Sequence, residues 1–387
     1  MKPFSIPFSQ AVLDDLRMRL RHTRWPDQVD GAGWSYGTEL SYLKELCSYW
    51  ENEFDWQRQV SILNSLHHYR VTIDDCLIHF VHERGNGPNP TPLIISHGWP
   101  SSFAEMLKII PMLTDPVRFG GKVEDSFDVV VPSLPGFGYS SPRRHGHMRA
   151  HELWAKLMTQ VLGYPSFVAQ GTDVGAGVTS LLGYFFPDCV RGIHISSVDL
   201  LWPDPLPPAS ELTKNEKRYL AGFEKWEKEE NGYGHIQGTK PQTLAYSLND
   251  SPAGLAAWIV EKFRSWSDCG GNIESRFTKD ELLTTIMIYW TTQTMNSSMR
   301  HYYHYANDVN LPRRKPGEKI RVPTGVAMFP GEKDLIVPRE FAQRSYDIRH
   351  WTNLPRGGHF AAVEEPELLV EDIRAFCRHI RTKGSTK

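Results

Sequence analysis

Residues 1–70 carry apolar side chains at helical spacing among many polar and charged ones. Leu43, Leu46 and Trp50, for example, recur every three or four residues and would lie on one face of a helix. The segment contains no catalytic motif that we recognise. We therefore expect an N-terminal helical segment, a meander that packs on the main domain.

From about residue 71 the pattern changes to short apolar runs that alternate with helical stretches. The expected elements are a hairpin at 71–81, strands at 92–96, 128–131 and 166–169, and helices at 102–113 and 150–162. Alternating strands and helices favour an α/β fold with a mostly parallel central sheet and helices on both faces. In such sheets, ligands bind at the carboxyl ends of the strands.

The strand pattern stops after residue 196 and resumes at 321–329. The interval is rich in Trp, Tyr and helical spacing, and the Pro-rich stretch 202–208 near its start predicts a linker. We therefore expect an inserted helical cap over the sheet. The expected boundaries are 1–70 for the N-terminal segment, 71–200 and 319–387 for the two parts of the core, and 201–318 for the cap.

Composition narrows the class of protein. The 387 residues, with 40% hydrophobic residues and 12 Trp, can bury a large core, and a net charge of −2 gives no electrostatic reason to expect nucleic acid as a partner. The five cysteines are scattered without metal-type spacing, which favours a reduced, cytoplasmic setting. The charged N-terminal pattern and the lack of a long apolar run predict a soluble chain without a membrane anchor. A homodimer stays open, since an exposed apolar patch would favour one.

Residues 170–177 (QGTDVGAG) have the form of a nucleophile elbow. They follow the strand expected at 166–169, precede apolar residues at helical spacing, and place glycine on both sides of Asp173. Glycines allow a sharp turn from strand to helix that exposes the central side chain above the sheet. Because many Gly/Asp-rich surface turns also fit this pattern, the interpretation depends on the rest of the chain.

An aspartate at the elbow limits the chemistry. A serine that attacked a saturated carbon would leave an ether, whereas a carboxylate leaves an ester whose carbonyl a second step can hydrolyse. Asp173 therefore indicates displacement at an sp3 carbon, with an epoxide or an alkyl halide as the electrophile.

Residues 97–100 (HGWP) follow the strand expected at 92–96. A turn there can aim the Trp99 backbone N–H at the same point as the Val174 N–H, which would give two donors for an oxyanion. His97 would hold this turn. The substrate is expected to contact the side chains of Trp99, Pro100, Phe137 and Phe360.

The C-terminal part completes the order nucleophile, acid, histidine. Glu332 and Asp334 follow the strand expected at 321–329, and His359 follows a strand-like stretch at 348–354. This is the chain order of an α/β-hydrolase triad. We expect His359 to be the general base and Glu332 to orient it, with Asp334 as the alternative acid.

Long stretches of the chain resemble the microsomal-type epoxide hydrolases of the α/β-hydrolase fold. The most specific stretches are residues 97–100, 232–241, 248–255, 289–292 and 357–368, and the similarity covers almost the whole chain. The resemblance implies that a small hydrophobic epoxide is converted to a vicinal diol through an ester on Asp173, without a metal or an organic cofactor. Relatives serve detoxification, catabolism, hormone turnover and natural-product assembly, so the pathway stays open.

The resemblance also implies two cap tyrosines that hydrogen-bond the epoxide oxygen. Their positions match Tyr233 and Tyr302, with Tyr303 as the alternative for the second. Such donors are needed because an alkoxide is too basic to leave unaided. The acid loop is one residue longer than in many relatives, which keeps Asp334 open beside Glu332.

Two other functions stay open at this point. A haloalkane dehalogenase would share the aspartate nucleophile, but those enzymes hold the departing halide with a tryptophan where this chain has Val174. A non-catalytic ligand-binding protein on the same fold would usually lack a triad residue, and the sequence provides all three.

Overall fold

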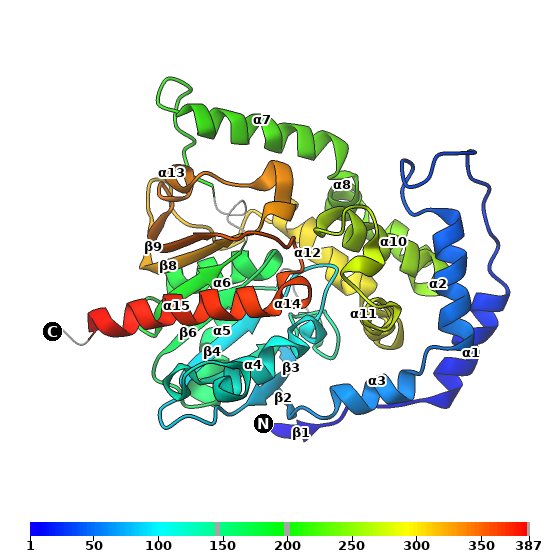
Figure 1. The fold of residues 1–387 in the computed structure, drawn as a ribbon, viewed down its shortest axis with the longest axis horizontal. Helices are drawn as coiled ribbons and strands as arrows, with labels where there is room; N and C mark the ends of the chain where they lie inside the picture. Colours follow the sequence, from blue (N-terminus) through cyan, green and yellow to red (C-terminus); the bar gives the residue numbers. More distant parts are fainter. Residues whose placement is uncertain (144–147, 197–201, 385–387) are drawn as a thin grey trace.

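The described part of the chain forms one mixed sheet in the order β1-β2-β3-β5-β4-β6-β7-β8-β9 (Figure 1). The structure is a computed structural model and describes residues 1–143, 148–196 and 202–384. The strands are β1 (Lys2–Phe4), β2 (His68–Ile73), β3 (Cys76–Glu83), β4 (Thr91–Ser96), β5 (Phe127–Pro132), β6 (Phe167–Gly171), β7 (Val190–Ile195), β8 (Ile320–Met328) and β9 (Tyr346–Asn353). Strands β1, β2, β3 and β5 pair antiparallel, and the neighbours from β5 to β9 are parallel.

The apolar runs in the sequence correspond to the central strands, because both faces of the parallel part of the sheet are covered. In β5, for example, every residue is buried, and Val129, Val130 and Val131 are each 0% exposed. A strand that is buried on both faces needs apolar side chains on both, so it shows a continuous run instead of alternation. The strands expected at 92–96, 128–131 and 166–169 are confirmed as β4, β5 and β6.

Helices cover the sheet and build a cap beside it. They are α1 (Gln10–Arg21), α2 (Leu40–Asn52), α3 (Trp56–Leu63), α4 (Ile109–Thr114), α5 (Ala150–Lys156), α6 (Val174–Phe185), α7 (Lys214–Glu229), α8 (Gly232–Thr239), α9 (Pro241–Asp250), α10 (Pro252–Trp266), α11 (Lys279–Thr292), α12 (Met295–Asn307), α13 (Arg339–Ala342), α14 (Ala361–Glu364) and α15 (Pro366–Gly384). Helices α7 to α12 stand between β7 and β8, where the inserted cap was expected. The expected start of the cap, at residue 201, lies outside the described residues.

The single helix expected at 102–113 is wrong. The chain forms a 3-10 helix, η1 (Phe103–Leu107), and then the separate helix α4. Pro111 gives the physical reason, because proline has no N–H and its ring clashes with the preceding turn of a helix. Restarting the helix at Ile109 puts Pro111 in the first turn, where that N–H has no partner in any case.

The N-terminal segment packs against the cap as well as the sheet. Helices α1 and α2 lie beside α10 and α11 (Figure 1). Arg19 donates a hydrogen bond to the Asp250 carbonyl at 2.9 Å, and the Tyr49 hydroxyl donates to Asp280 at 2.9 Å. The short strand β1 was not predicted, because three residues are too few to show a period.

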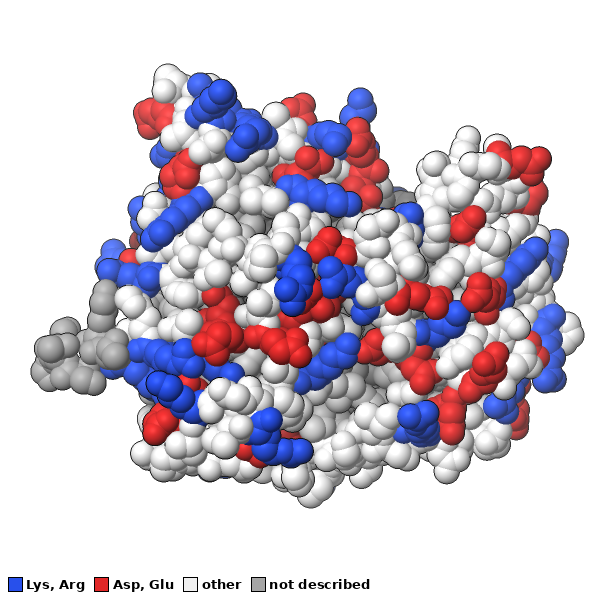
Figure 2. All heavy atoms as spheres, viewed as in Figure 1, with Lys and Arg blue, Asp and Glu red and all other residues white. Residues whose placement is uncertain are grey.

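Within the described ranges, no helix is long and apolar enough to cross a membrane. On the face shown in Figure 2, basic and acidic side chains are interspersed over both the core and the cap. The cysteines are all free thiols in the structure.

A buried carboxylate joins α15 to the sheet. Asp372 accepts hydrogen bonds from His194 on β7 and His350 on β9, each at 2.8 Å. Burial alone would raise the pKa of Asp372, but the two histidines outweigh burial and lower it. The side chain of His194 is 0% exposed, so solvent does not replace the hydrogen bond that it makes to Asp372.

We expect Asp372→Ala to lower the free energy of unfolding by about 2 to 4 kcal/mol, because it removes the acceptor from a buried histidine. Asp347→Ala is the matched control, since Asp347 pairs with Arg349 at the surface of β9. Such exposed pairs contribute about 0 to 1 kcal/mol. Denaturant unfolding of both variants measures the difference, and equal midpoints would contradict this role for Asp372.

Candidate active site

Asp173 stands at a strained turn between β6 and α6. Its backbone has φ +52° and ψ −129°, a conformation that side-chain-bearing residues rarely adopt and that costs about 1 to 3 kcal/mol. A Cβ at Gly171 would lie 2.1 Å from the Gly175 carbonyl oxygen, and one at Gly175 would lie 2.1 Å from the Ser96 carbonyl oxygen. The turn therefore needs both glycines, as the elbow pattern predicted.

We expect Gly175→Ala to destabilise the fold by about 3 kcal/mol or more, because β4 and α6 would have to separate to admit the methyl group. Gly232→Ala is the control, since a Cβ there meets nothing within 4 Å. Thermal unfolding of the two variants makes the comparison. If Gly175→Ala has the same melting temperature as the wild type, β4 and α6 do not approach each other as closely as described.

Backbone donors hold the Asp173 carboxylate above the sheet. The Trp99 N–H donates to Oδ1 at 2.8 Å, and the Val174 N–H also bonds to the carboxylate. Gly98 permits this approach, because a Cβ there would lie 2.4 Å from the same Oδ1. Burial raises the pKa of Asp173, but His359 and the two N–H groups outweigh burial and lower it below its ordinary value. The carboxylate is therefore ionised at neutral pH.

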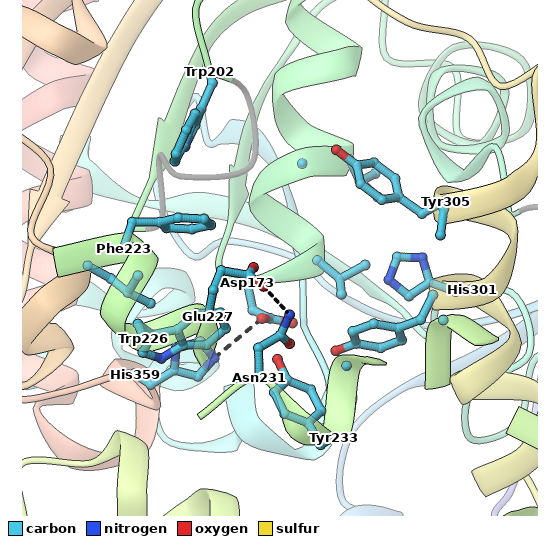
Figure 3. Close-up of a pocket in the computed structure, with 18 of the residues that line it drawn as sticks. Asp173, Trp202, Phe223, Trp226, Glu227, Asn231, Tyr233, His301, Tyr305 and His359 are labelled. Atoms are coloured by element: carbon cyan, nitrogen blue, oxygen red, sulfur yellow. Dashed lines mark hydrogen bonds and ion pairs between the residues drawn. The ribbon is translucent and has the colours of Figure 1, made fainter. Parts of the chain in front are cut away.

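His359 bridges two carboxylates. Its Nε2 lies 3.5 Å from Asp173 Oδ2, its Nδ1 lies 3.1 Å from Glu332 Oε1, and its backbone N–H donates to the Trp266 carbonyl at 2.9 Å. Burial alone would lower the pKa of His359, but Glu332 and Asp173 hold it well above its usual range. Figure 3 shows the imidazole directed at Asp173.

The acid loop, η6 (Pro330–Leu335), brings Glu332 to His359 and turns Asp334 away. Lys333 between them has φ +46°, so the chain direction changes at this residue. Asp334 Oδ2 lies 3.1 Å from Lys225 Nζ on α7, and the Asp334 side chain is 42% exposed. Of the two acids left open by the sequence, only Glu332 lies against His359.

Two cap tyrosines face the elbow. Tyr233 on α8 and Tyr302 on α12 both line the cavity above Asp173, and their ring centroids are 5.9 Å apart. The Tyr233 ring also stacks on Trp99, with centroids 5.1 Å apart and an interplanar angle of 5°. Burial raises the pKa of Tyr302 well above its ordinary value, so its phenol keeps the proton. Tyr303 instead points outward and is 41% exposed.

The cavity above Asp173 has a volume of about 920 Å³. Beyond the tyrosines its wall is mainly apolar, and Figure 3 shows Trp202 and Phe223 across from Tyr233. Among the described residues that form the wall, Trp99, Pro100, Phe137 and Phe360 are absent, contrary to the expectation of substrate contact. Phe137 packs on His97 and Phe360 stacks on Phe263, so they support the site from behind.

Three residues beside Asp173, Glu332 and His359 were not predicted from the sequence. Burial raises the pKa of both Glu105 and Glu364 to about 7. Glu364 accepts the backbone N–H of Phe360 at 3.0 Å, and the Trp266 ring lies 4.9 Å from the His359 ring. Glu364 lies within the specific stretch 357–368, but its place beside His359 was not inferred from it, and no motif marks Glu105 or Trp266. Within the described ranges, no cluster of three or more His, Cys, Asp or Glu side chains could hold a metal ion.

The fold and the site define a class, an α/β hydrolase with an aspartate at the elbow. Comparison with known families agrees with this class. Residues 1–106 match the family model described as epoxide hydrolase N terminus, and residues 91–231 match the one described as alpha/beta hydrolase fold.

Full-length relatives identify the family. The chain is 38% identical to epoxide hydrolase 1 of Oryctolagus cuniculus over 97% of this chain and 88% of that protein. It is 43% identical to a Stigmatella aurantiaca protein provisionally named an epoxide hydrolase, over 98% of this chain and 86% of that one. The solved juvenile hormone epoxide hydrolase of Bombyx mori superposes with a TM-score of 0.84 at 30% identity, covering 98% of this chain and 94% of that one. The chain belongs to the epoxide hydrolase family.

Proposed function

We propose that the protein hydrolyses a hydrophobic epoxide to a vicinal diol through an ester on Asp173. The observation that carries the proposal is the pairing of an ionised carboxylate on a strained elbow with two tyrosines on the opposite side of one cavity. Displacement at an epoxide carbon needs a nucleophile on one side and a proton donor near the oxygen on the other. Asp173 below, and Tyr233 and Tyr302 above, meet both needs.

In the first step, an Asp173 oxygen attacks an epoxide carbon and forms a C–O ester bond. The bond between that carbon and the epoxide oxygen breaks, and the oxygen takes a proton from a tyrosine hydroxyl. The product is a hydroxyalkyl ester on Asp173 and a tyrosinate. The raised pKa of Tyr302 means that this group is protonated at the start of the step and regains its proton readily afterwards.

In the second step, water is added to the ester carbonyl. Ester formation removes the negative charge of Asp173, which is one of the two charges that raise the pKa of His359. The imidazolium then gives up its proton more easily, and the tyrosinate left by the first step takes that proton. The neutral imidazole can then take a proton from water, while Glu332 keeps it oriented. The resulting oxyanion is stabilised by the Trp99 and Val174 N–H groups, and its collapse releases the diol and the carboxylate.

Single turnover in water enriched in heavy oxygen tests the ester. The added oxygen enters the Asp173 carbonyl group, so we expect label on the Asp173 carboxylate and none in the first diol released. Label directly in that diol would contradict the covalent step. Chloride release from a haloalkane, measured in parallel without diol formation from styrene oxide, would replace the proposal with a dehalogenase.

The two tyrosines are expected to share proton donation. Tyr233→Phe and Tyr302→Phe should each slow ester formation roughly 10- to 100-fold, and the double variant more than about 10³-fold, because the alkoxide then leaves without a donor. Rapid-mixing measurement of the first step with styrene oxide gives these rates. Tyr303→Phe is the control because Tyr303 faces solvent, and an equal effect of Tyr303→Phe would mean that the residues are assigned wrongly.

A further inference from the structure

A buried lysine lies against two aromatic rings at the border of the cavity. Lys262 on α10 is 6% exposed, and its Nζ lies 4.9 Å from the ring centroid of Tyr233 and 5.4 Å from that of Trp266. A lysine is almost never buried to this extent unless its charge is compensated. Within the described wall of the cavity Lys262 is not a lining residue, so the proposed steps make no direct use of it.

Two glutamates compensate the charge of Lys262. Its Nζ lies 2.7 Å from Glu230 Oε1 and 2.7 Å from Glu261 Oε2. Glu230 Oε1 also accepts the indole N–H of Trp266 at 3.0 Å. One carboxylate oxygen therefore ties the ammonium group to the tryptophan, and the lysine is held in a single place.

This cluster connects Tyr233 to the rest of the site. The Tyr233 ring contacts Trp266 at 5.1 Å between centroids, and the Trp266 ring lies 4.9 Å from that of His359. The ammonium is within the range at which a cation is attracted to the face of an aromatic ring, and the attraction is stronger where water is excluded. Tyr233 is thus restrained by Trp99, Trp266 and Lys262 together.

We propose that Lys262 is a positioning residue for ester formation. Its ammonium group holds the Tyr233 ring on Trp99, so that the phenol hydroxyl stays where the epoxide oxygen must receive its proton. The inference rests on the proposed function and deepens it by adding a residue that acts through Tyr233. Small displacements of a reacting group lower rates strongly, which gives the restraint its effect.

The test measures ester formation and ester hydrolysis separately in Lys262→Met. This substitution keeps most of the side-chain volume and removes the charge. We expect ester formation from styrene oxide to slow roughly tenfold, with hydrolysis of the formed ester unchanged, and Lys262→Arg to restore most of the rate. Lys279→Met is the matched control. Lys279 also pairs with two glutamates, Glu45 and Glu274, and its Nζ lies 5.8 Å from the Tyr49 ring on the N-terminal side of the cap.

A double-mutant cycle with Tyr233→Phe distinguishes positioning from general support. If Lys262 acts through the Tyr233 hydroxyl, Lys262→Met should change ester formation by less than about twofold in the Tyr233→Phe background. A tenfold loss in that background, or equal slowing of both steps, would overturn the inference. Should Lys262→Met fail to fold, Lys262→Gln carries the same test, because it removes the charge and can still donate to Glu230.

The rate of the wild-type protein distinguishes failure of this inference from failure of the proposed function. No diol from the wild type would overturn the proposed function and this inference with it. Diol formation by the wild type, together with wild-type rates in Lys262→Met, would overturn the inference alone.

Discussion

Replacing Asp173 by alanine is expected to lower epoxide turnover by at least about 10⁴-fold while leaving the protein folded, because no other group can form the ester. In this variant the two N–H groups and the imidazole lose the carboxylate on which they converge. Diol formation from styrene oxide by purified wild type and variant measures the loss. The melting temperature shows whether the variant is folded.

The strain at residue 173 sharpens this test. The positive φ is a property of the backbone, so Asp173→Ala keeps the same strain and differs from the wild type only in the carboxylate. Residual turnover within about tenfold of the wild type would mean that water attacks the epoxide directly. In that case Asp173 would not be the nucleophile.

His359→Gln is expected to stop the reaction halfway. Asp173 keeps its Trp99 and Val174 hydrogen bonds in this variant, and we expect it still to form the ester. Without the imidazole no group takes the proton from water, and we expect turnover to fall by about 10³-fold or more while the ester accumulates. Intact-protein mass spectrometry after mixing with styrene oxide should show an added mass equal to one epoxide.

The variant Asp173→Ala is the control for the trapped ester, because it cannot form the adduct. A His359→Gln variant that binds styrene oxide but gains no mass would show that the imidazole is needed in the first step. The roles of His359 and Asp173 would then have to be divided differently. Glu332→Gln should accumulate less ester than His359→Gln, because the imidazole remains and loses only its partner at 3.1 Å.

The sequence alone was sufficient for the elbow and the central strands. Both leave a mark on the local sequence: glycine is required where a Cβ would lie 2.1 Å from a carbonyl oxygen, and a strand covered on both faces must be apolar throughout. The same local argument failed at 102–113. There Pro111 interrupted a helix that apolar spacing had favoured.

The choices that the sequence left open depended on the path of the backbone through space. Glu332 and Asp334 are two residues apart and chemically alike, but the turn at Lys333 sends one to His359 and the other to Lys225. Tyr302 and Tyr303 are adjacent, and the rotation of helix α12 puts the first in the cavity and the second in solvent. Spacing along the chain specifies neither the turn at Lys333 nor the rotation of α12.

The sequence by itself determined the class of fold, and it placed the carboxylate that we propose to react and the expected order of nucleophile, acid and histidine, because each follows from local backbone geometry or from the period of apolar residues. Only the tertiary structure decided which acid serves His359, which tyrosines face Asp173 and which aromatic residues line the cavity. It alone brought Lys262 against Tyr233, 29 positions earlier in the chain. These contacts join residues that are far apart in sequence, and the packing of the cap on the sheet sets their distances.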